Sequence, residues 1–112
     1  MQFSKKGNMY RIMRMTGNQD NILGVCFSKN DSDEIQVIEF RPMSDSKIET
    51  SQTEVLKQVI SGLKSINQSL GTDYKLSKIY YLPSEKSTDR VYSLLIIKLI
   101  LRYHNREEFK EI

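Results

Sequence analysis

The sequence predicts a single α+β domain, residues 1–112, in which a four-stranded antiparallel sheet carries two helices packed on one face. Two observations lead to this prediction. The N-terminal third consists of short runs of alternating apolar and polar residues separated by turn residues, as strands require. The remainder holds two segments with helical periodicity and one strand-like run between them. The predicted order is therefore strand-strand-strand-helix-strand-helix.

The first three strands are predicted at residues 8–16, 22–28 and 34–41. In the first run, Tyr10 and Ile12 point to one face and the methionines to the other. The second run alternates in the same way, and the third is rich in β-branched and aromatic residues. Because the connectors are short and polar, these strands are expected to pair as an antiparallel meander.

The first helix is predicted at residues 51–70, where a Ser-Gln-Thr-Glu capping pattern precedes apolar residues at intervals of three and four. Residues 75–82 give the fourth strand. The second helix spans residues 87–106 and is expected to be capped by Ser87 or Thr88. It is apolar around nearly its whole circumference, so it must be covered on two sides. The first helix or a partner chain can supply the second cover, which leaves room for a homodimer.

Composition excludes several classes of protein. The net charge is +3, and the basic residues are scattered rather than gathered in runs, which favours a solvated surface over a nucleic-acid site. The longest apolar run has eleven residues, whereas a membrane-spanning helix needs about 20. No secretory signal is recognisable, and the single cysteine, Cys26, fits a reducing compartment, so a cytoplasmic location is expected.

No catalytic, metal or nucleotide motif is present. His104 is the only histidine, so a zinc site of the usual His and Cys type is not available, and it is expected either to cap the end of the last helix or to be exposed. Glu39 could serve an enzyme, but no base or nucleophile stands at a recognisable spacing from it. The chain is therefore predicted to have no enzymatic activity, no cofactor and no metal. Composition and spacing alone name no function.

Two groups of residues could mark an interface. Asp31, Asp33 and Glu34 place three carboxylates at a hairpin tip, where they form either a solvated loop or a negative patch for a basic protein such as a nuclease. Tyr80 and Tyr81 are adjacent on a strand and face opposite sides. One is expected in the core, and the other could be an interface anchor.

Four segments together resemble a family of immunity proteins from bacterial contact-dependent growth inhibition systems. The resemblance covers most of the chain and rests on the pattern and order of the segments. They are Ile22-Leu23-Gly24-Val25-Cys26-Phe27-Ser28, Val37-Ile38-Glu39-Phe40, Leu76-Ser77-Lys78-Ile79-Tyr80-Tyr81-Leu82-Pro83, and Val91-Tyr92 through to Tyr103-His104-Asn105.

The resemblance implies a cytoplasmic protein without enzymatic activity. It would bind over the active site of a cognate toxin domain, often a nuclease acting on transfer RNA, and need neither nucleic acid nor a membrane. The candidate toxin contacts are Asp31, Asp33 and Glu34, followed by Tyr81 and Glu85. Such proteins are commonly acidic, whereas this chain is basic. The interpretation therefore requires a local acidic patch, or a toxin contacted away from its active site.

The alternative function is a small nucleic-acid-binding or regulatory module. It would use a basic sheet face formed by Arg11, Arg14, Arg41 and Lys78. Its signature is salt-sensitive binding to RNA or DNA, because phosphate contacts release counterions.

Overall fold

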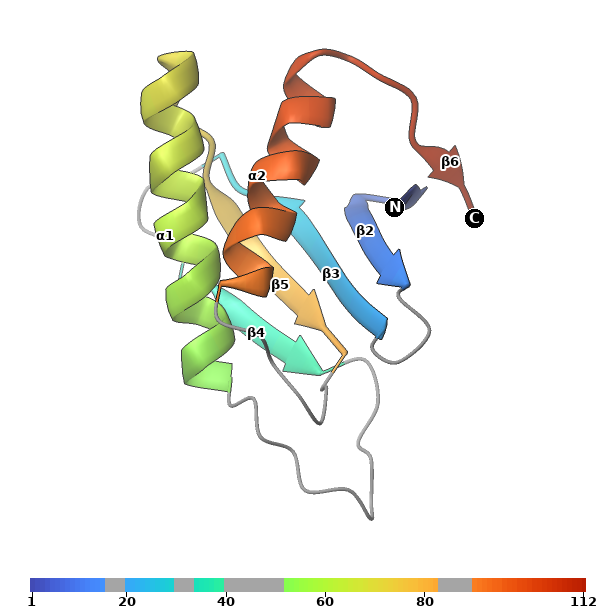
Figure 1. The fold of residues 1–112 in the computed structure, drawn as a ribbon, viewed down its shortest axis with the longest axis horizontal. Helices are drawn as coiled ribbons and strands as arrows, with labels where there is room; N and C mark the ends of the chain where they lie inside the picture. The colour runs from blue at the N-terminus through green and yellow to red at the C-terminus, as the bar shows by residue number, and fades with distance from the viewer. Residues whose placement is uncertain (16–19, 30–33, 40–51, 83–89) are drawn as a thin grey trace.

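The computed structural model describes residues 1–15, 20–29, 34–39, 52–82 and 90–112. They form a mixed six-stranded sheet with two helices lying side by side across one face (Figure 1). The order of the strands in the sheet is β4-β5-β3-β2-β1-β6. In chain order the elements are β1 (Gln2–Lys6), β2 (Met9–Met15), β3 (Asp20–Phe27), β4 (Gln36–Glu39), α1 (Gln52–Leu70), β5 (Leu76–Tyr81), α2 (Val91–His104) and β6 (Lys110–Glu111).

The α+β class is confirmed, and the four-stranded antiparallel sheet is wrong. Two strands were not predicted. β1 contains Phe3 as its only large apolar residue, and it pairs with β2 through a tight turn at Gly7, whose φ is +58°. β6 has only two residues and runs parallel to β1. Both strands gave too weak an apolar pattern to be recognised.

The predicted meander is also wrong, because β4 does not pair with β3. β5 lies between them, antiparallel to β3 and parallel to β4. Val25, Ile79 and Val37 therefore stand in one row across three strands. Ile79 and Tyr81 are fully buried, whereas no residue of β4 is. The more apolar strand therefore takes the interior position and the shorter one takes the edge.

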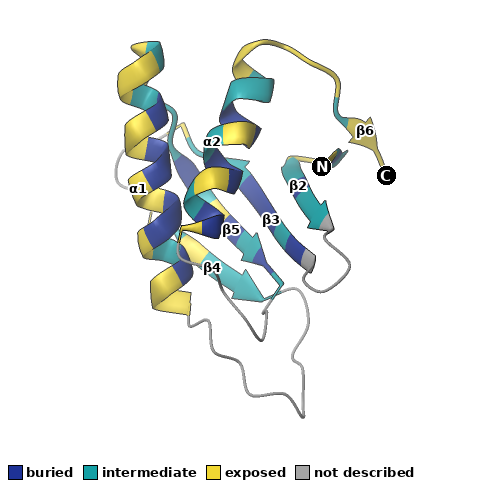
Figure 2. Ribbon diagram, viewed as in Figure 1, coloured by how far each residue is buried: buried dark blue, intermediate teal, exposed yellow. Residues whose placement is uncertain are grey.

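Each helix is buried on the side that faces the sheet and the neighbouring helix (Figure 2). Gly62 in α1 lies directly against Ser93 and Ile96 in α2. The second cover that α2 requires is thus α1. The buried residues of α2 are Val91, Tyr92, Leu95, Ile96, Leu99 and Ile100.

The ends of the helices differ in part from the prediction. α2 begins at Val91, and Arg90 precedes it in a left-handed conformation with no side-chain capping bond. The predicted caps Ser87 and Thr88 lie outside the described residues. Neither α1 nor α2 combines the length and the apolar character that crossing a bilayer requires.

Candidate interaction site

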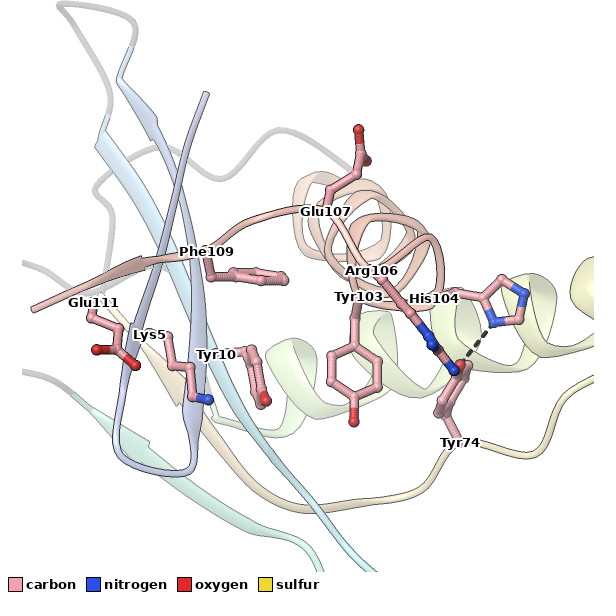
Figure 3. A pocket seen from close by; sticks show the side chains of 9 residues that line it. All are labelled: Lys5, Tyr10, Tyr74, Tyr103, His104, Arg106, Glu107, Phe109 and Glu111. Carbon is pink, nitrogen blue, oxygen red and sulfur yellow. Dashed lines mark hydrogen bonds between the residues drawn. The ribbon is translucent and has the colours of Figure 1, made fainter.

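A hollow of about 660 Å³ lies at the C-terminal end of α2, between that helix, the first two strands and the C-terminal segment (Figure 3). We call it the aromatic hollow. Four of its nine lining residues are tyrosine or phenylalanine, and four carry a charge. The lining residues are Lys5, Tyr10, Tyr74, Tyr103, His104, Arg106, Glu107, Phe109 and Glu111.

The aromatic side chains of the hollow are packed against one another. Tyr103 stacks on Phe27 with ring centroids 4.4 Å apart, and Tyr10 meets Tyr103 edge to face at 5.0 Å. Phe109 meets Tyr10 in the same way, also at 5.0 Å. Each such pair contributes roughly 0.5–1.5 kcal/mol beyond its buried area. The rings therefore hold one another in place.

The C-terminal segment is fixed to the rest of the fold by Arg102. Its Nε donates a hydrogen bond of 2.8 Å to the Glu108 carbonyl oxygen. Its guanidinium carbon lies 4.3 Å from the centroid of the Phe3 ring and 5.9 Å from that of Phe109. A cation over an aromatic face is attracted by the ring quadrupole. These contacts bring Phe109 and Glu111 to the hollow.

Tyr74 is positioned by the turn that follows α1. The Asn67 side chain accepts a hydrogen bond from the Tyr74 amide at 3.0 Å and donates one to the Tyr74 carbonyl oxygen at 3.1 Å. The Tyr74 hydroxyl is in turn hydrogen-bonded to Nδ1 of His104 at 2.8 Å. His104 was expected to cap the helix end or to be exposed. It is exposed, and its ring joins α2 to the loop before β5.

The charges around the hollow are of both signs. Lys5 lies 5.3 Å from the centroid of the Tyr10 ring, and Arg106 stands at the end of α2. Figure 3 shows Glu107 turned away from the other side chains and Glu111 near Lys5. Within the described residues, none of these four groups forms an ion pair. Both cations thus remain available to a partner.

Burial raises the pKa of the Tyr103 hydroxyl, and the neighbouring Tyr10 and Tyr74 raise it further, against the opposing effect of Lys5. Tyr103 therefore stays protonated at neutral pH. Its hydroxyl can donate or accept a hydrogen bond. The hollow thus presents aromatic surface, hydroxyl groups and two cations, all of which can contact a binding partner.

Of the five predicted contact residues, the structure describes only Glu34 and Tyr81, and neither lines the hollow. Tyr81 is fully buried, and its hydroxyl donates a hydrogen bond of 2.8 Å to Oε1 of Glu39, so it offers no surface to a partner. Glu34 is exposed. Asp31, Asp33 and Glu85 lie outside the described residues.

The three described basic residues of the alternative function lie on both faces of the sheet. The alternation of β2 puts Arg11 on the face away from the helices and Arg14 on the face beneath them. Arg11 donates a hydrogen bond of 3.0 Å to the hydroxyl of Ser4. Lys78 is exposed on the same face as Arg11, and Arg41 is not described.

Sequence reasoning missed the aromatic hollow because its residues come from β1, β2, the turn before β5, the end of α2 and the C-terminal segment. No spacing along the chain connects them. The usable signal was an aromatic residue near the end of several elements, as at Tyr74 and Tyr103. In the part of the chain that is described, no group of three or more His, Cys, Asp and Glu side chains could hold a metal. Comparison with protein-family models, curated proteins and solved structures gives no match.

Proposed function

We propose that this chain is a non-enzymatic immunity protein that binds and neutralises the toxin domain of a contact-dependent growth inhibition system. The aromatic hollow carries the proposal. Tyrosine and arginine are enriched among the residues that supply most of the binding energy in protein interfaces, and phenylalanine is enriched in interface cores. Here they line a concave surface whose rings are already packed, so little side-chain freedom is lost on binding.

The mixed charges of the hollow favour a protein partner over a nucleic acid. Glu107 and Glu111 line it together with Lys5 and Arg106. A phosphate backbone would be repelled by the two carboxylates, whereas a protein surface can match both signs. The resemblance of the sequence to immunity proteins supports the same partner class. The partner we propose is the cognate toxin domain, a nuclease acting on transfer RNA or another RNA.

The acidic residues form a second candidate contact. Glu34 lies two residues before the start of β4, which is the opposite edge strand from β6 beside the hollow. A standard interface buries about 800 Å² on each partner, roughly 20 to 30 residues. Because Glu34 and the hollow lie toward opposite edges of the sheet, the acidic residues and the hollow are tested separately. We keep Asp31, Asp33 and Glu34 as proposed contacts to basic toxin residues.

The test is co-expression with the toxic C-terminal domain encoded directly upstream, scored by growth and by co-purification. We expect survival and a stable one-to-one complex. Replacing Asp31, Asp33 and Glu34 together with Ala should slow association and reduce protection, because long-range attraction raises the association rate. Unchanged binding by this triple variant would remove the acidic residues from the contact surface. Cell death with the unaltered protein present would reject the function itself.

A further inference from the structure

We infer that Arg106 is the anchor for a carboxylate on the toxin, so that the toxin surface bound at the aromatic hollow is acidic. This inference rests on the proposed function. It adds the chemistry of the contact and the residue that makes it. An acidic partner surface also fits the net charge of +3 of this chain.

The backbone of Arg106 gives the first reason. Its φ is +56°, in the left-handed region where a side chain is strained and where glycine is usual after a helix. The main chain alone closes this turn, since the Arg106 amide donates to the Tyr103 carbonyl at 3.2 Å and the Glu107 amide to that of Arg102 at 3.1 Å. A glycine would make the same bonds. The fold therefore does not require an arginine here.

The surroundings of the guanidinium give the second reason. Within the described residues, Arg106 forms neither an ion pair nor a side-chain hydrogen bond, although it lines the hollow beside Tyr74 and Tyr103. Figure 3 shows its side chain extended along the hollow, on the side of His104, while that of Glu107 points away. A guanidinium is weakly hydrated and binds a carboxylate through two parallel hydrogen bonds. Arg106 is exposed at the rim of the hollow, so its guanidinium is accessible to such a carboxylate.

The distribution of charge gives the third reason. Glu111, the other carboxylate of the hollow, lies near Lys5 rather than near Arg106 (Figure 3). The Arg106 end of the hollow is therefore positive, and the complementary surface is negative. A nuclease binds phosphates through a positive cleft. The toxin surface that meets Arg106 is consequently outside such a cleft.

Arg106→Gly and Arg90→Gly make a matched pair for the test. Arg90 also has a left-handed φ, of +70°, and does not line the hollow. Each replacement removes one positive charge and relieves one strained φ. We expect both variants to unfold at the same temperature as the parent protein, or higher. With the purified upstream toxin domain, Arg106→Gly should raise the Kd by about 30-fold or more, and Arg90→Gly should leave it within about twofold.

Arg106→Lys separates the charge from the guanidinium geometry and should raise the Kd by an intermediate factor. Toxin binding by Arg106→Gly at the parental Kd would overturn the inference and leave the proposed function standing. Equal weakening by both glycine variants would also overturn it, because the effect would then follow net charge rather than the hollow. If the unaltered protein fails to bind the toxin domain, the proposed function and this inference fall together.

Discussion

Tyr81 is a buried side chain whose polar end has a single charged partner. Its hydroxyl donates a 2.8 Å hydrogen bond to Glu39 on the neighbouring strand. Tyr81→Phe should lower the free energy of unfolding by about 1–2 kcal/mol, because a partly buried hydrogen bond to a charged group is lost. Tyr10→Phe is the control, since within the described residues the Tyr10 hydroxyl has no hydrogen-bond partner; its cost should stay below about 0.5 kcal/mol. Urea unfolding measures both. Equal costs would contradict the role of this bond.

The hydrogen bond between Tyr81 and Glu39 also predicts that the stability of the fold depends on pH. Burial raises the pKa of Tyr81 above the usual tyrosine value, and the hydrogen bond to Glu39 and its negative charge raise it further. The folded protein therefore holds this proton more tightly than the unfolded chain does. The contribution is fully present below the unfolded pKa of about 10 and is lost as the pH rises above it.

The difference in unfolding free energy between the parent protein and Tyr81→Phe should therefore shrink between pH 9 and pH 11. Urea unfolding at several pH values in that range measures it. Comparison with the variant isolates this hydroxyl from Tyr92 and Tyr103, whose pKa values burial also raises. A difference that stays constant to pH 11 would contradict the prediction.

At the scale of the elements, the contact between α1 and α2 depends on Gly62. A β-carbon there would lie 2.5 Å from the Ile96 Cγ2 atom and 2.5 Å from the Ser93 carbonyl oxygen. Gly62→Ala should destabilise the fold by about 1–3 kcal/mol, although alanine favours a helix by about 1 kcal/mol. The exposed neighbour Ser61 gives the control, since Ser61→Ala should have little effect or stabilise. A higher free energy of unfolding for Gly62→Ala in urea would show that the two helices can move apart to admit the methyl group without loss of stability.

Periodicity predicted the elements with the strongest patterns and failed for the weakest. The stripe of α1 and the apolar surface of α2 identified both helices, alternation identified β2 and β3, and strand-favouring composition identified β4 and β5. β1 was not recognised because a strand next to the edge of a sheet can form with few apolar residues. Tyr80 and Tyr81 show the same limit at one position. Alternation says that they face opposite sides, but the side that the helices cover decides which is buried.

At the scale of the whole molecule, neither the sheet order nor the hollow could be predicted from the sequence. Short connectors favour neighbours in sequence, but β5 enters between β3 and β4 because burial of Ile79 and Tyr81 outweighs that preference. The hollow arises only when the end of α2, the sheet edge and the C-terminal segment meet. Glu34 and Tyr81, the described residues among the predicted contacts, do not line it.

The C-terminal segment both covers the edge of β1 and closes the hollow, and Phe109 joins the two roles. Its ring meets Phe3 at 5.9 Å and Tyr10 at 5.0 Å, whereas β6 itself adds only two residue pairs and a 3.0 Å bond from the Ile112 amide to the Lys5 carbonyl oxygen. Phe109→Ala should therefore release this segment while the helices and the central strands stay folded.

Amide hydrogen exchange, monitored by NMR, measures the release of the C-terminal segment. In Phe109→Ala the Ile112 amide should exchange at nearly the rate of an unstructured peptide, and amides of the central strand β3 should keep their protection. Lys110→Ala, at an exposed position of β6, is the control and should leave Ile112 protected. Continued protection of Ile112 without the Phe109 ring would mean that backbone pairing alone holds the segment. Loss of protection throughout β3 would mean that the segment is part of the global fold. The expected result instead makes Phe109 the residue through which the sheet edge and the Lys5 end of the hollow form or open together.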